Sequence, residues 1–236
     1  MSGIREYRRE RATGQPPHLH PPYGSTVKRA PRRPPHPIVQ TLSEVTGPGF
    51  ADGWAGPDRA DLTRQGQGAP IGERIILAGR VLDEDGRPVP RTLIELWQCN
   101  AAGRYRHERD QHDAPLDPNF FGAGQVVTGA EGEYRFLTIK PGAYPWRNSD
   151  NAWRPAHIHF SLFGPAFATR LVTQMYFLGD PLLALDPIFL SIADEEARQS
   201  LVAAYDPALS QAEFALGYRF DIVLRGREAT PLEAAP

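Results

Sequence analysis

The stretch ERIILAGRVLDEDGRPVPRTLIELWQ, residues 73–98, contains two apolar segments on either side of a turn signal. Residues 75–82 and 92–98 are rich in Ile, Leu and Val, which pack well on the surface of a β-sheet. Between them, residues 83–88 combine Asp, Gly and Pro, the residue types that turns prefer. The stretch therefore predicts two β-strands joined by a turn.

The rest of the chain beyond this stretch repeats the same pattern of short apolar segments and turn residues. Further strands are expected over residues 125–128, 134–139, 157–163, 169–177 and 218–224. One helix is expected, from Asp194 to Tyr205, because it begins with three acidic residues and its apolar residues share a helical face. We therefore predict a mainly β fold: a β-sandwich of mixed or antiparallel sheets with few short helices.

The N-terminal region is expected to be an extended, irregular arm. The chain has 24 Pro and 22 Gly in 236 residues, and Pro is concentrated at residues 16–37. Proline fixes φ and removes a backbone donor, so this region favours polyproline-like segments over a packed domain. We predict an arm over residues 1–70, ordered through contact with a partner subunit, and one catalytic β-sandwich domain over residues 71–236.

Charge is distributed unevenly along the chain. The net charge is -2, whereas residues 1–36 hold eight basic and two acidic side chains. A basic arm can bind nucleic acid. The alternative is that it lies along an acidic partner or along the chain's own body. We favour the alternative, and expect no nucleic-acid partner, because the arm is Pro-rich and has no nucleic-acid motif.

The expected cellular location follows from what the sequence lacks. Cys99 is the only cysteine, so no disulfide within the chain is expected. The charged residues 1–11 do not resemble a secretory signal. No apolar run reaches the roughly 18 residues that a membrane span requires, so no membrane partner is expected. A reducing, cytoplasmic compartment is the expected location.

The clearest candidates for chemistry are His157 and His159. Residues i and i+2 of a strand point to the same face, so both imidazoles can reach one metal ion. The alternative is a pair of histidines that only form hydrogen bonds. Two histidines do not complete a catalytic site, since an iron(II) site adds a carboxylate and a zinc site a further His, Cys or carboxylate.

Two tyrosines could supply oxygen donors. Tyr144 lies between Gly142 and Pro145, in a segment that can fix its direction, and Tyr105 follows an expected strand. A free phenol has a pKa of about 10, so a strong Lewis acid such as Fe(III) is needed to keep it ionised at neutral pH. Either tyrosine alone could be a packing residue, and spacing alone does not pair them with the histidines.

Three motifs together resemble the signature of the intradiol ring-cleavage dioxygenases. They are Gly103-Arg104-Tyr105, Pro141-Gly142-Ala143-Tyr144-Pro145 and Arg154-Pro155-Ala156-His157-Ile158-His159-Phe160. The resemblance extends from about residue 70 to the C-terminus, and the Pro-rich arm is also similar. It implies one non-haem Fe(III) per chain, held by four residues that we call the donor cluster. The donor cluster consists of Tyr105, Tyr144, His157 and His159.

The resemblance also implies roles for individual residues. Tyr144 and His159 would be axial ligands, and the other two members of the donor cluster equatorial. Arg154 and Tyr144 would be catalytic: Arg154 by stabilising negative charge on the substrate, Tyr144 by taking up a substrate proton. The substrate pocket would be lined by Trp146, Gln174 and Ile188.

Within the family, the branch that cleaves protocatechuate (3,4-dihydroxybenzoate) is the most similar. The activity implied is cleavage with O2 to 3-carboxy-cis,cis-muconate, a step of aromatic-compound catabolism. A homologous α subunit is the implied partner, in αβ units that assemble into a larger oligomer. One alternative is a catechol or hydroxyquinol 1,2-dioxygenase, whose helical N-terminal linker this Pro-rich N-terminus does not resemble. Another is a non-catalytic β-sandwich binding module, which has no use for the donor cluster.

Overall fold

The computed structural model describes residues 8–36, 59–146, 150, 153–164 and 170–233. Its strands are β1 (Arg74–Leu82), β2 (Leu93–Trp97), β3 (Ala123–Val127), β4 (Glu133–Ile139), β5 (Tyr144–Pro145), β6 (Trp153–Arg154), β7 (His157–Phe163), β8 (Arg170–Phe177), β9 (Val202–Tyr205), β10 (Leu216–Arg219) and β11 (Ile222–Val223). Its helices are α1 (Gly24–Arg29), η2 (Leu62–Arg64), η4 (Pro181–Leu185), α3 (Pro187–Leu190) and α4 (Glu195–Gln199). None of the helices in the described ranges is long and apolar enough to cross a membrane.

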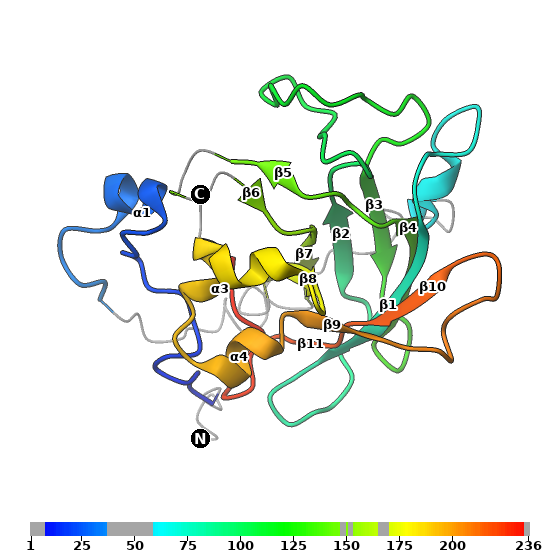
Figure 1. Cartoon of the computed structure of the whole chain (residues 1–236). Coiled ribbons are helices and arrows are strands. Elements are labelled where there is room, and N and C mark those ends of the chain that lie inside the picture. The colour runs from blue at the N-terminus through cyan, green and yellow to red at the C-terminus, as the bar shows by residue number, and fades with distance from the viewer. Residues whose placement is uncertain (1–7, 37–58, 147–149, 151–152, 165–169, 234–236) are drawn as a thin grey trace.

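The strands form a mixed sheet that curls around one core. Its order in the described residues is β11-β1-β10-β9-β8-β7-β2-β3. Strand β4 lies outside this order and also pairs with β1. Strand β3, at one end of this path, contacts β4, so the sheet folds back on itself (Figure 1). Side chains from opposite parts of the sheet, such as Phe136 of β4 and Phe160 of β7, are fully buried in one apolar cluster. The prediction of a mainly β sandwich with few short helices is confirmed.

The turn predicted at residues 83–88 is present and connects strands with different neighbours. The Asp83 carboxylate accepts hydrogen bonds from the backbone N–H groups of Asp85 and Arg87, both at 2.9 Å. Gly86 has a φ of 74°, a conformation that glycine adopts without strain. Strand β1 pairs with β4, β10 and β11, whereas β2 pairs with β3 and β7. The chain therefore passes from one part of the curled sheet to another.

The helix predicted from Asp194 to Tyr205 is wrong in its second half. Helix α4 ends at Gln199, and residues 202–205 form β9. This strand pairs in parallel with β8 and antiparallel with β10, and Ala203 at its centre is fully buried. A short apolar segment can fit either a helix or a strand, so its pattern alone does not decide between them. Here, pairing with two neighbouring strands decides for the strand.

Other strands also differ from the prediction. The single strand expected over residues 218–224 is divided into β10 and β11, with the buried Phe220 between them. The two-residue strands β5 and β6 were not expected, because they are too short to show a periodic pattern. Strand β8 covers residues 170–177 of the predicted 169–177, and residue 169 lies outside the described residues.

The described part of the arm lies along the chain's own acidic side chains. Arg11 forms ion pairs with Glu196 at 2.6 Å and Glu228 at 2.5 Å. Arg8 forms one with Asp85 at 2.8 Å. For this part of the arm, the structure therefore supports contact with its own body. The parts of the arm at residues 1–7 and 37–58 lie outside the described residues.

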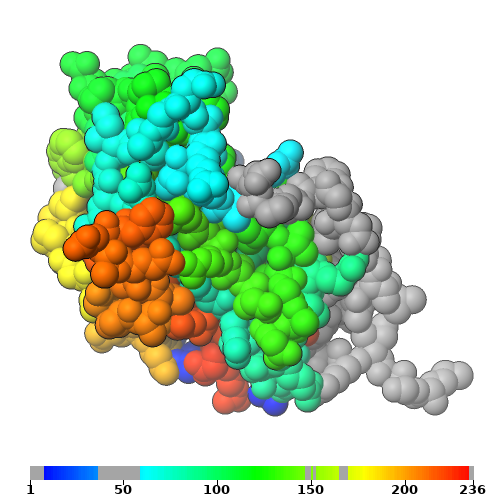
Figure 2. All heavy atoms as spheres, turned by 90° about the vertical axis from the view of Figure 1, so that its right-hand side faces the viewer, coloured from blue at the N-terminus to red at the C-terminus, as the bar shows by residue number. Residues whose placement is uncertain are grey.

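The last part of the predicted arm contacts the β-sandwich. In Figure 2 the cyan atoms lie against the green atoms of later parts of the chain. Leu62 of η2 is fully buried in the main apolar cluster, and Arg59 donates to Gln125 of β3. The boundary at residue 70 itself stays a prediction.

A buried tyrosine gives a test of the packing between strands. The Tyr134 hydroxyl of β4 donates to the backbone oxygen of Phe220, which lies between β10 and β11. We expect Tyr134→Phe to lower the free energy of unfolding by about 1–3 kcal/mol, because a buried carbonyl loses a donor. Thermal denaturation would measure this, with the exposed Tyr205→Phe as the control. Equal melting temperatures for the two variants would contradict this role of the hydroxyl.

Candidate metal centre

Strand β7 presents both histidines of the donor cluster on one buried face. His157 and His159 are 1% and 8% exposed, and their ring centroids lie 4.9 Å apart. They are opposite Tyr176 and Gln174 of β8, at one end of the antiparallel pairing. The alternation of side chains along the strand therefore brings the two imidazoles together, as the sequence predicts.

Both imidazoles are held through their Nδ1 atoms, so the Nε2 atoms point away from these partners. Nδ1 of His157 lies 2.8 Å from the backbone oxygen of Pro155. Nδ1 of His159 lies 3.0 Å from the carboxylate of Glu233. Burial, with the nearby Arg154 charge, lowers the pKa of His157 well below its ordinary value. A neutral His157 that donates through Nδ1 has an acceptor lone pair on Nε2, and this atom lies 3.1 Å from Nη1 of Arg154.

The loop after β2 and the start of β5 bring the tyrosines to these Nε2 atoms. Gly103 has a φ of 77° and lies so close to the Ala143 backbone oxygen that a Cβ would collide with it. Only glycine permits this approach, which sets Tyr105 beside Tyr144 with ring centroids 5.4 Å apart.

The phenol oxygens complete the cluster. Oη of Tyr105 lies 3.2 Å from Nε2 of His159, and Oη of Tyr144 lies 3.5 Å from Nε2 of His157. The structure therefore brings together all four residues of the donor cluster, which come from β7, β5 and the loop after β2.

The donor set fits a cation of high charge. Burial raises the pKa of Tyr105 well above its ordinary value, and it raises that of Tyr144 too. Each phenol therefore keeps its proton unless a strongly charged cation displaces it. Among the residues that the structure describes, no group of three or more His, Cys, Asp and Glu could hold a metal ion.

Arg154, at the end of β6, places a fixed positive charge beside the cluster. The side chain is almost fully buried, and Nη1 lies 3.1 Å from Nε2 of His157. Its Nη2 donates to the Asp186 carboxylate at 2.7 Å, and Nε donates to the same carboxylate at 3.3 Å. Nη2 also donates to Gln174 at 2.7 Å and to Tyr176 at 3.0 Å. These contacts hold the guanidinium in one orientation.

The residues predicted to line a pocket lie next to this arginine. Gln174 accepts one of its hydrogen bonds, and the guanidinium lies 5.2 Å from the centre of the Trp146 ring. Ile188 of α3 belongs to a small apolar cluster against which Trp146 packs. The structure thus places all three predicted lining residues beside Arg154 or one another.

Several residues around the cluster were missed by the sequence analysis. Tyr23, just before α1, packs on Trp146 with ring centroids 5.1 Å apart. Its only signal is that it is an aromatic residue in a Pro-rich arm. Asp186 precedes α3 and resembles an ordinary helix cap, and Glu233 lies in the C-terminal tail. None of these positions shows a pattern that points to a site.

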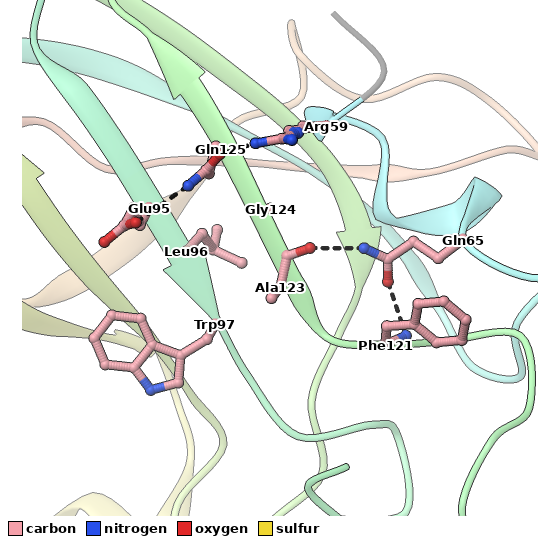
Figure 3. A pocket seen from close by; sticks show the side chains of 9 residues that line it. All are labelled: Arg59, Gln65, Glu95, Leu96, Trp97, Phe121, Ala123, Gly124 and Gln125. Carbon is pink, nitrogen blue, oxygen red and sulfur yellow. Dashed lines mark hydrogen bonds between the residues drawn. The ribbon is translucent and has the colours of Figure 1, made fainter. Parts of the chain in front are cut away.

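A separate hollow of about 590 Å³ lies along β2 and β3 (Figure 3). Its polar wall includes Gln125, which donates to Glu95. Trp97 also lines it and stacks on the His159 ring at 4.8 Å, nearly parallel. No member of the donor cluster lines this hollow, so it is distinct from the candidate metal centre.

Comparison with known proteins gives matches along most of the chain. Residues 45–226 match the family described as Dioxygenase. Residues 7–41 match the family described as Protocatechuate 3,4-dioxygenase beta subunit N terminal. The chain is 59% identical to the protocatechuate 3,4-dioxygenase beta chain of Burkholderia cepacia, over 92% of this chain and 93% of that protein.

More distant relatives share the same fold. The protocatechuate 3,4-dioxygenase alpha chain of Burkholderia cepacia is 32% identical over 82% of this chain and 96% of its own length. The solved structure of 3-chlorocatechol 1,2-dioxygenase from Rhodococcus opacus 1CP superimposes with a TM-score of 0.55. That match covers 78% of this chain and 72% of the solved chain at 23% identity, so it supports the fold alone.

Proposed function

Because this chain belongs to the intradiol ring-cleavage dioxygenases, we propose that it cleaves protocatechuate with O2 to 3-carboxy-cis,cis-muconate. It is an enzyme of aromatic-compound catabolism, in the role of the beta chain of protocatechuate 3,4-dioxygenase. The observation that carries the proposal is the convergence of two phenol oxygens and two imidazole nitrogens at one buried place.

The donor cluster would hold one non-haem Fe(III) per chain. Two phenolates and two neutral imidazoles suit a hard, highly charged cation, and burial of the phenols makes such a cation necessary for their ionisation. When bound, Fe(III) would withdraw electron density from a coordinated catechol and so activate the ring toward O2. The residues that would hold the Fe(III) are Tyr105, Tyr144, His157 and His159.

The protein's own residues would supply proton transfer and a fixed charge. As a phenolate, Tyr144 would take up a proton at Oη from a substrate hydroxyl, and this Oη lies 3.5 Å from Nε2 of His157. Arg154 would stabilise negative charge that develops on the substrate ring. Its guanidinium is already oriented by Asp186, so no reorganisation is needed during the reaction.

The substrate would bind against the side chains around Arg154. Trp146 and Ile188 offer apolar surface, and Gln174 offers a buried side-chain amide beside Arg154. Tyr23 extends the Trp146 surface toward α1. Together these residues would orient the aromatic ring and exclude water from it.

The proposed partner is a homologous α chain, in αβ units that assemble into a larger oligomer. The support is the likeness to both chains of the same enzyme in Burkholderia cepacia. A cytoplasmic location, favoured by the single cysteine, stays a prediction.

The main alternative is a catechol or hydroxyquinol 1,2-dioxygenase. The curated hydroxyquinol 1,2-dioxygenase of Rhizobium sp. (strain MTP-10005) matches over only 62% of this chain and 51% of its own length. The beta chain of Burkholderia cepacia matches over more than nine tenths of both chains, including the arm. This difference in coverage favours protocatechuate as the substrate.

The visible absorption spectrum of the αβ protein tests the proposed site. We expect a broad charge-transfer band, because a tyrosinate bound to Fe(III) absorbs visible light. Tyr144→Phe should shift or weaken the band, because one of the two phenolates is lost. Tyr205→Phe, at an exposed tyrosine of β9, should leave it unchanged. A colourless, iron-free protein that still turns over protocatechuate would refute the proposal.

A further inference from the structure

The C-terminal tail brings the carboxylate of Glu233 to Nδ1 of His159, one of the proposed metal ligands. Oε2 of Glu233 lies 3.0 Å from Nδ1 of His159, on the side of the ring opposite Nε2. The Glu233 side chain is 18% exposed, so the contact is largely shielded from water. An imidazole Nδ1–H that donates to a carboxylate has its tautomer and ring orientation fixed.

Several hydrogen bonds hold the tail in this position. The Glu233 backbone N–H donates to Val172 of β8 at 2.7 Å. The Thr173 hydroxyl donates to the Pro231 backbone oxygen, also at 2.7 Å. Gln15 of the arm accepts a hydrogen bond from the Leu232 backbone N–H at 2.7 Å. Gln15 of the arm and β8 therefore both hold the segment of residues 231–233 that carries the carboxylate.

The two histidines of the donor cluster are held in different ways. Nδ1 of His157 faces a neutral backbone oxygen two residues away, which no side-chain substitution removes. Nδ1 of His159 faces a carboxylate from the far end of the chain, 74 residues away in sequence. An anionic acceptor raises the basicity of the bound imidazole more than a carbonyl does, so the two nitrogens would be unequal donors.

We propose that Glu233 is a positioning residue that orients His159 and strengthens its Nε2 as a metal donor. The inference deepens the proposed function and rests on it. Glu233 does not contact substrate in this role, because His159 lies between it and the phenol oxygen of Tyr105. The C-terminal tail is then part of the metal site, although it is far from the sequence motifs.

The experiment compares Glu233→Ala and Glu233→Gln with Leu232→Ala in the full-length chain co-purified with its α partner. Leu232 is the exposed neighbour in the same tail, so its truncation tests disturbance of the tail alone. The readouts are iron retained per chain during dialysis against a chelator, and the position of the visible band. The glutamine side chain keeps an oxygen that can accept the hydrogen bond but removes the negative charge. If Glu233→Ala does not fold, Glu233→Gln still tests the proposal.

We expect Glu233→Ala to weaken iron retention by about 10–100-fold, the usual effect of removing such an outer partner. Its band should move to longer wavelength, because a weaker imidazole donor makes the metal ion more electron-poor. Glu233→Gln should show a smaller change of the same sign, and Leu232→Ala none. Iron retention and band position equal to wild type in both Glu233 variants would overturn the inference. An iron-free wild-type protein would instead overturn the proposed function.

Discussion

Arg154→Lys should lower kcat by about 10²–10³-fold, the typical effect of removing one fixed group that stabilises charge in a transition state. The guanidinium contacts Asp186, Gln174 and Tyr176 at once, and it still presents Nη1 beside His157. A lysine ammonium is a single point charge on a flexible stem and cannot keep all these contacts. The charge that offsets Asp186 is retained, so the protein should fold.

Steady-state kinetics on protocatechuate would measure this effect, together with iron content and the visible band. Both should remain near wild type, since Arg154 is not a member of the donor cluster. The matched control is Arg170→Lys at the other end of the β7–β8 pairing, where Phe163 faces Arg170. Unchanged kcat in Arg154→Lys, or an equal loss in the control, would contradict the role of Arg154.

The strands could be predicted where the local sequence and the final pairing agree. Strand β7 has the bounds expected for it, because residues 157–163 form an apolar segment that is buried in the middle of the sheet. Strand β9 was predicted as helix because its sequence also fits a helical face. What decides its structure is the pair of neighbours, β8 and β10, which the sequence does not display.

The candidate site could be predicted only in part for a similar reason. The pairing of His157 with His159 follows from strand geometry. The approach of Tyr105 to Tyr144 depends on loops that meet at Gly103, and such contact is invisible in spacing. The resemblance to a family supplied that pairing. Glu233 and Asp186 had no signal, since an acid before a helix or in a tail is usually structural.

Asp186→Asn should destabilise the protein by about 3–5 kcal/mol, the usual cost of breaking a buried ion pair from one side. Asp186 is fully buried, and its carboxylate lies 2.7 Å from Nη2 of the almost fully buried Arg154. Asparagine can still accept the hydrogen bond from the Ile188 backbone N–H, which caps the first turn of α3. The variant therefore removes the negative charge while it keeps the helix cap, and the Arg154 charge is left uncompensated in the interior.

The charge explanation predicts a partial rescue. Arg154→Met combined with Asp186→Asn leaves neither charge buried, so the double variant should be less destabilised than the sum of the single variants. Thermal denaturation at matched protein concentration would measure the differences, and Asp206→Asn, at an exposed pair with Arg219, should change little. Additive losses in the double variant would mean that Asp186 contributes through shape and hydrogen bonds. A clear rescue would mean that the fold tolerates this buried pair because Arg154 is needed beside the donor cluster.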